Sequence, residues 1–275
     1  MTGPDLPYRP PFFARLLAPA GPAMPLRIRR DGADVLLVPG LYSNVVILLG
    51  PHDVAVVDTG SVLDVPLVMR SLASAGRAPE DVAFVTTTHL HFDHVMGLDR
   101  LALRLGVPIR LGRVAHDHVL AGRPLRFPMS ALALWHCVST WPMQGLPFAK
   151  PDLAKGFGFG FPGSHNAFEA PLGAPLEDLD ELPGLPGWRV LATPGHADDA
   201  ICLHHEESGV LVAGDTVRNF LRGEWNPLVT DAHAFAATRA RLARLRVTAI
   251  LPGHGPALEG TDVLRRVRIT PQWMP

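Results

Sequence analysis

The chain has 275 residues, of which 47% are apolar and 7% aromatic, so it can bury the core of one large domain or two small ones. Its formal net charge is −1 and only two of its 25 basic residues are lysine, so there is no basic excess for a nucleic-acid partner and no acidic excess typical of disorder. The N-terminus lacks a signal-peptide pattern and no apolar run reaches membrane-spanning length, so we expect a cytoplasmic protein without a membrane partner.

The first third of the chain begins with a proline-rich stretch and then alternates strands with a helix. Residues 1–32 show no clean periodicity, which predicts an N-terminal arm beside a single domain over residues 33–275. Apolar residues between Leu67 and Ala73 have helical spacing that ends at Gly76, and Gly50–Asp53 has the composition of a hairpin connection. Strands are predicted over Val35–Val38, Val45–Leu49, Val54–Val57 and Val82–Val85.

Four potential metal ligands follow the last of these strands within six residues, His89-Leu-His91-Phe-Asp93-His94. Neutral imidazole and carboxylate groups are suitable ligands for zinc and related divalent ions. In chains of this composition, such a hexapeptide arises by chance in roughly two of a thousand sequences. The motif therefore predicts a metal site.

The last third adds candidates at the points where predicted strands stop. His196, Asp215 and His254 each follow an apolar run, and each lies beside glycine or proline, which permits a sharp turn from strand to loop. Asp231 is a plausible N-cap for a helix that continues to about Leu245. The predicted strands of this part are Val190–Ala192, Ile201–Leu203, Val210–Ala213 and Val247–Leu251.

Taken in order, these motifs resemble the metallo-β-lactamase superfamily of metal-dependent hydrolases. The resemblance rests on Val57-Asp58-Thr59-Gly60, the HxHxDH of residues 89–94, and the three later candidates, and it covers residues 35–112 and 188–268. It implies an α+β fold, a four-layer αββα sandwich with a dinuclear metal site at one edge of two sheets. In that family pattern, one divalent ion is held by His89, His91 and His196, the other by Asp93, His94 and His254, with Asp215 bridging both and Asp58 orienting the motif loop.

Hydrolysis is the chemistry expected of this ligand set. Two divalent ions, zinc as the expected metal with iron or manganese as alternatives, share a water and lower its pKa from 15.7 to about 7. The bridging hydroxide would attack a carbonyl polarised by the ion at His89, His91 and His196. Asp93, the candidate catalytic residue, would orient the hydroxide and pass a proton to the leaving group.

When the family's other reactions are excluded in turn, cleavage of a carboxylic ester, lactone or amide in a small-molecule substrate is favoured. Only 21 residues follow His254, too few for the helical thioester-binding domain of glyoxalase II relatives. His91 stands where diiron oxygen-reducing relatives carry a carboxylate, and the whole set looks most like lactonases and other carboxylic ester hydrolases. The alternatives are a β-lactamase, a phosphodiesterase or ribonuclease of the same fold, and a non-catalytic metal-binding interaction protein.

Two departures from the family's pattern concern the substrate. The motif is followed by Val95-Met96-Gly97, where relatives commonly have a glycine pair, and His196 follows His94 by 102 positions. We interpret residues 113–187 as a lid-like insertion that covers an apolar substrate, although its aromatics equally suit a local core or a homodimer interface. The lid candidates are Phe157, Phe159 and Phe161.

The remaining histidine pairs and the cysteines receive structural interpretations. His116 and His118 follow a predicted helix start and are expected to be exposed, whereas His204 and His205 end a strand pattern in which neighbouring side chains face opposite ways. The two cysteines are far apart and form no CxxC pattern, so we expect buried thiols rather than a disulfide or a thiolate metal site.

Overall fold

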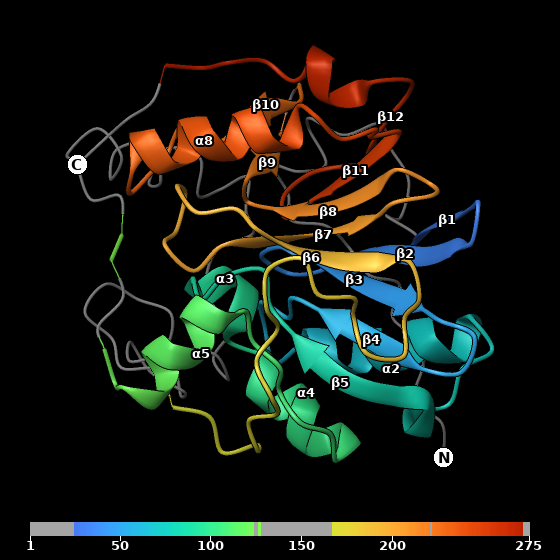
Figure 1. Ribbon diagram of the computed structural model, residues 1–275. Coiled ribbons are helices and arrows are strands. Elements are labelled where there is room, and N and C mark those ends of the chain that lie inside the picture. The colour runs from blue at the N-terminus through green and yellow to red at the C-terminus, as the bar shows by residue number, and fades with distance from the viewer. Residues whose placement is uncertain (1–24, 124–125, 128–166, 221, 272–275) are drawn as a thin grey trace.

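The computed structural model describes residues 25–123, 126–127, 167–220 and 222–271. Two mixed β-sheets pack face to face, with helix α8 over the outer face of one sheet and helices α2 and α4 over the outer face of the other (Figure 1). This arrangement is the four-layer αββα sandwich expected from the sequence.

The first sheet has the strand order β1-β2-β3-β4-β5. Its first four strands are antiparallel neighbours, whereas β4 and β5 run parallel and are connected through α2 (Asp64–Ser74) and the short helix η1 (Pro79–Asp81). The predicted hairpin at Gly50 is confirmed, since its amide donates to the carbonyl of Asp53 at 2.8 Å. The strand bounds are β1 Leu26–Arg30, β2 Ala33–Pro39, β3 Asn44–Leu49, β4 Val54–Val57 and β5 Val82–Thr86.

Strand β1 corrects the predicted extent of the N-terminal arm. Residues 26–30 pair antiparallel with β2 and form an edge of the sheet, so they belong to the domain. Only Ile28 of this strand is buried, and three of its five residues are arginine. Such a polar edge strand is stabilised by pairing with its neighbour and carries little apolar signal of its own.

The second sheet has the order β12-β11-β8-β7-β6, and β9 and β10 form a separate ribbon. Only β8 and β11 are parallel neighbours in this sheet. Asp231 caps helix α8 as predicted, because its carboxylate accepts the amide of Ala234 at 2.9 Å. The bounds are β6 Trp188–Ala192, β7 Ile201–His205, β8 Val210–Gly214, β9 Val217–Arg218, β10 Glu224–Trp225, α8 Ala232–Leu242, β11 Ala249–Pro252, β12 Leu258–Glu259 and η3 Val263–Arg266.

Three apolar clusters correspond to the three contacts between the four layers. The first lies between β1–β5 and the helices α2 and α4 (Leu98–Leu105), the second between the two sheets, and the third between the second sheet and α8. Neighbouring residues such as Leu36 and Leu37 belong to different clusters, as the alternation of side chains along a strand requires. Both faces of the inner strands are therefore apolar, which explains their nearly continuous apolar runs.

The described parts of the predicted insertion belong to the domain core, so the predicted bounds of the insertion, residues 113–187, were too wide. Residues 113–120 form helix α5 (Arg113–Leu120), and Ala115 joins the first apolar cluster. After the gap, Ala170 joins the same cluster, and Leu176 and Leu182 pack between the sheets. The lid candidates Phe157, Phe159 and Phe161 lie outside the described residues.

Within the described ranges, no helix combines the length and the apolar character needed to cross a membrane.

Candidate metal centre

All seven candidate ligands lie shortly after the carboxyl ends of strands, and all are buried. The HLHFDH motif follows β5 and includes the short helix α3 (Phe92–Val95), while the later candidates follow β6, β8 and β11. Because β4 and β5 are parallel, as are β8 and β11, their carboxyl ends meet at one edge of the sandwich. The structure thus brings together every ligand candidate that was predicted from the sequence.

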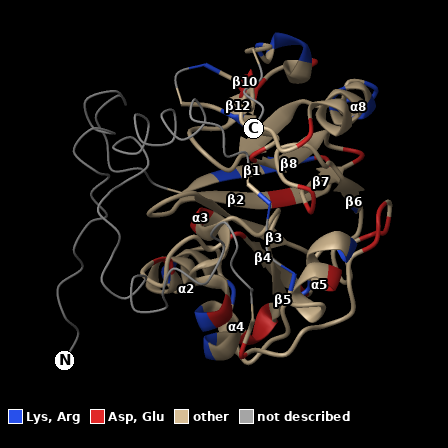
Figure 2. Cartoon of the chain, turned by 90° about the vertical axis from the view of Figure 1, so that its left-hand side faces the viewer, with Lys and Arg blue, Asp and Glu red and all other residues tan. Residues whose placement is uncertain are grey.

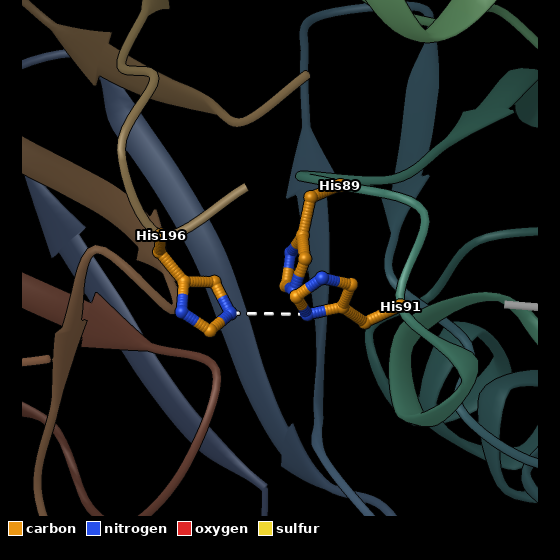
Figure 3. Close-up of side chains that lie close together, drawn as sticks. All are labelled: His89, His91 and His196. Carbon is orange, nitrogen blue, oxygen red and sulfur yellow. Dashed lines mark hydrogen bonds between the residues drawn. The ribbon is translucent and has the colours of Figure 1, made fainter. Parts of the chain in front are cut away.

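His89, His91 and His196 form one compact group. Their ring centroids lie 4.4 Å, 4.7 Å and 5.0 Å apart in pairs, and the rings converge from opposite sides of the site (Figure 3). His196 Nε2 is 3.1 Å from His91 Nδ1. The ligand atoms of the three residues are close enough together to hold one metal ion.

Asp93, His94 and His254 form a second group with the same property. His254 Nε2 lies 3.1 Å from Asp93 Oδ2, and His94 Nε2 lies 3.8 Å from the same oxygen. The two groups match the division of ligands that the family resemblance implies.

Asp215 lies between the two groups and presents one carboxylate oxygen to each. Its Oδ1 is 3.3 Å from His254 Nε2 and 3.4 Å from His94 Nε2, whereas its Oδ2 is 3.6 Å from His196 Nε2. A carboxylate in this position could coordinate two cations at once.

Buried polar atoms without partners test whether this cluster fits metal ions. Within the described part of the chain, His89 Nε2, His91 Nε2, His94 Nε2 and Asp215 Oδ1 are buried and have no hydrogen-bond partner. Buried polar atoms in folded proteins are almost always hydrogen-bonded, so four orphaned atoms in one cluster require another partner. The unpaired ring nitrogens and the carboxylate oxygen fit the donor set of divalent ions such as zinc.

Ionisation in the first group favours cation binding. Burial, together with the neighbouring imidazoles, holds the pKa of His89 and of His91 well below the ordinary value, and burial lowers the pKa of His196. These rings are neutral at physiological pH, which is the form that coordinates metals.

The second group carries protons instead. Burial alone would lower the pKa of His254, but the carboxylates of Asp215 and Asp93 raise it to about 9. The pKa of His94 is also raised well above its ordinary value, because Asp58, Asp93 and Asp215 outweigh its burial. The metal-free protein therefore places positive charge where a cation would otherwise neutralise the carboxylates.

Hydrogen bonds on the far ring nitrogens orient three of the histidines. His196 donates Nδ1–H to the carbonyl of Leu228 at 2.7 Å, and His94 donates Nδ1–H to Asp58 Oδ2 at 3.0 Å. His89 Nδ1 lies 3.1 Å from Thr88 Oγ1. Each bond leaves Nε2 facing the cluster, an arrangement typical of histidines that bind metals.

Asp58 organises the motif loop, as the family resemblance implies. Besides His94, its carboxylate accepts Thr88 N at 2.7 Å and Thr87 Oγ1 at 2.8 Å. Its backbone adopts the left-handed conformation with φ of 59°, which is unusual for a residue other than glycine. Strain of this kind is retained where the surrounding contacts hold it in place, commonly at functional sites.

A turn between β2 and β3 clamps two of the ligand loops. Ser43 Oγ donates to the carbonyl of Asp93 at 2.6 Å, and Asn44 donates through Nδ2 to the carbonyls of Pro252 and Gly255, on either side of His254. These contacts join loops from the two sheets. Nothing in the local sequence of this turn marks it as part of a site.

Sequence reasoning also missed three side chains that contact the candidate ligands. Asn226 is buried and donates to Asp215 Oδ2 at 3.5 Å. The ring of Phe127 lies against His91 with a centroid separation of 4.1 Å, and the ring of Phe220 stacks on His254 at 5.4 Å. None of the three belongs to a motif, so only the fold reveals them.

The histidines that were set aside lie outside the cluster. His204 and His205 are buried in β7, where His204 Nε2 donates to the carbonyl of Arg246 and His205 Nδ1 accepts the amide of Ser208. His116 and His118 lie half-buried on α5, so the expectation that this pair is exposed was only partly right.

Comparisons with known proteins agree with this fold. The model of the metallo-β-lactamase superfamily matches residues 38–254. The probable metallo-hydrolase YflN of Bacillus subtilis is 22% identical over 267 residues, which cover 88% of this chain and 93% of that protein. Among solved structures, a metallo-β-lactamase family protein from Thermus thermophilus is 27% identical with a TM-score of 0.57, covering 86% of this chain and 76% of that one.

A second solved structure has the same fold. The protein TTHA1623, solved in a di-iron-bound form, is 22% identical with a TM-score of 0.54, and the match covers 83% of this chain and 94% of that one. The likeness at this identity concerns the fold. Since the superfamily model spans every candidate ligand from His89 to His254, the chain belongs to the metallo-β-lactamase superfamily.

Proposed function

We propose that the protein is a metal-dependent hydrolase that cleaves a carboxylic ester, lactone or amide bond. The observation that carries the proposal is the position of Asp215, whose two carboxylate oxygens face two separate groups of candidate ligands. Sites with a purely structural metal usually enclose one ion, whereas a carboxylate shared by two three-residue groups fits a pair of ions that can act together on a substrate.

His89, His91 and His196 would hold one divalent ion, Asp93, His94 and His254 the other, and Asp215 both. Such a pair of ions supplies an acidified water as nucleophile and positions for a substrate oxygen. Zinc fits the histidine-rich donor set, and iron or manganese are alternatives.

Asp93 is the residue that we propose for proton transfer. Burial raises the pKa of its carboxyl group, but the charges and hydrogen bonding of His94 and His254 lower the pKa by more, so the group is ionised at neutral pH. Its side chain is 12% exposed, against 0% for His94 and 5% for His254, so it faces the open side of the cluster. From there Asp93 would hold the attacking water, accept its proton and pass that proton to the leaving group.

The choice of an acyl substrate rests on the ligand set and on charge. Basic and acidic residues are interspersed along the described elements (Figure 2) and the formal net charge is −1, which offers little to a phosphodiester polymer. A β-lactam is an amide in a strained ring and therefore belongs with the acyl substrates to be tried.

The decisive experiment is metal analysis followed by a substrate panel of lactones, carboxylic esters, β-lactams, thioesters and a phosphodiester. We expect two metal equivalents per chain and hydrolysis within the acyl group of substrates. The Asp93→Ala variant should lose turnover. Activity on the phosphodiester alone would overturn the proposal, and a metal-replete Asp93→Ala variant with unchanged turnover would remove Asp93 from the mechanism.

A further inference from the structure

Two phenylalanine rings flank the candidate metal centre, one beside each group of ligands. Phe127 lies against His91 of the first group, with the ring planes inclined by 33°. Phe220 stacks on His254 of the second group, with an inclination of 28°. Both phenylalanines are only partly buried, so each retains ring surface next to a candidate ligand.

Each ring also has surroundings outside the centre, and Phe127 packs against the first apolar cluster. Arg126, the neighbour of Phe127, pairs with Asp198 at 2.9 Å. The guanidinium of Arg218 lies 5.3 Å from the centroid of Phe220, and its Nε donates to Glu224 at 2.9 Å. Arg218 is itself buried, so the ring of Phe220 rests against a fixed cation.

The carboxylates mark where the scissile bond must approach. The side chains of Asp93 and Asp215 are 12% and 10% exposed, and His94, His196 and His254 are at most 5% exposed. A scissile bond placed between the two ligand groups would direct one part of the substrate toward each group, and so toward the phenylalanine beside it.

We propose that Phe127 and Phe220 are specificity-determining residues that select substrates with an apolar group on each side of the scissile bond. This inference rests on the proposed acyl hydrolase function. Aromatic side chains supply large apolar contact area to a ligand, and neither ring offers a hydrogen bond that a polar substituent could use. The alternative is that the rings only hold His91 and His254 in position.

The test uses four esters that combine two acyl groups with two alcohols: ethyl acetate, ethyl hexanoate, benzyl acetate and benzyl hexanoate. The metal-loaded wild-type protein should prefer hexanoate to acetate and benzyl to ethyl in kcat/KM. Phe127→Ala should lower one of these preferences about tenfold and Phe220→Ala the other, since a methylene group in an apolar pocket changes kcat/KM by about that factor. Phe127→Leu and Phe220→Leu are the matched controls, and they should keep most of each preference.

Binding gives an independent readout. Hexanoate should bind the loaded wild-type protein more tightly than acetate by calorimetry, and the alanine variant that lowers the acyl preference should lose most of this difference. Metal content is measured for every variant. A variant that loses metal because a histidine is displaced lowers kcat/KM for all four esters by the same factor.

Equal scaling of all four esters in both alanine variants would overturn the inference and leave the rings with a positioning role. Loss of the same preference in both variants would overturn it as well. If the loaded wild-type protein cleaves none of the four esters, the inference is also wrong. The proposed function fails with it only if the lactones, β-lactams and thioesters are inert too.

Discussion

Replacing Asp58 with asparagine should separate its effect on metal binding from its effect on folding. In the structure, Oδ1 of Asp58 accepts Thr88 N and Thr87 Oγ1, while Oδ2 accepts the Nδ1–H of His94 and the hydroxyl of Thr88, which can rotate to accept instead. An asparagine carbonyl in place of Oδ1 keeps the two threonine bonds. Its amide nitrogen, however, would face His94 Nδ1 as a second donor.

The ring of His94 can relieve this clash by giving up its Nδ1 proton and keeping a proton on Nε2, the nitrogen that faces the cluster. A protonated Nε2 cannot coordinate a cation, so we expect metal affinity at the Asp93, His94 and His254 group to fall about 10- to 100-fold. The cost to folding is one charge-assisted hydrogen bond, about 1.5–3 kcal/mol. The metal equivalents retained after dialysis should drop from two toward one.

Calorimetric metal titration and thermal unfolding in chelator measure the two effects separately. Asp64→Asn is the matched control, because Asp64 is also buried and its carboxylate accepts the amides of Leu41 and Ser61. We expect it to destabilise the fold without changing metal affinity. Wild-type affinity for two ions in Asp58→Asn would refute the role of Asp58 in setting the His94 tautomer.

Four further outcomes are expected. Asp215→Ala should lower affinity for both ions in a metal titration, since its carboxylate faces both groups; loss of one ion alone would refute the bridging role. The pKa of His254 is raised to about 9, so the metal-free protein should lose up to about 3 kcal/mol of stability as the pH rises from 6.5 to 9. Urea unfolding across this pH range measures the loss, and a stability that does not change with pH would contradict the raised pKa. Metal binding at pH 7 should accordingly release at least one proton, seen by calorimetry in buffers of different protonation enthalpy. Gly60→Ala should destabilise the protein and weaken metal binding, because a β-carbon there overlaps the carbonyl oxygen of Asp93, and an unaltered melting temperature would contradict this.

The inner strands and the candidate ligands could be predicted from the sequence because both leave local signals. A strand buried on two faces is a short apolar run, and a ligand at its carboxyl end is a polar residue beside glycine or proline, as at His196 and His254. Strand β1 has no such signal, since its pairing with β2 stabilises a mostly polar segment.

The parts that escaped prediction depend on contacts between residues distant in sequence. Residues 167–187 pack against the core through isolated β-bridges, such as the one between Ile109 and Leu172. They are also held by the carboxylate of Asp99, which accepts hydrogen bonds from the amides of Glu169 and Ala170. Asn226, Phe127 and Phe220 likewise acquire their positions only when the sheets pack. A single sequence carries no record of these pairings.

The division of the ligands between the two sheets couples metal uptake to completion of the fold. Among the described residues, each group of side chains able to hold an ion takes at least one residue from the HLHFDH loop of the first sheet and one from the second sheet, and this holds also for the group that His89 and His94 form with Asp215. A fragment that ends before β11 lacks His254 and cannot complete the group that contains Asp93 and His94. Bound ions would therefore act as cross-links between two halves of one chain, and chelation would loosen the contact between the sheets as well as stop catalysis.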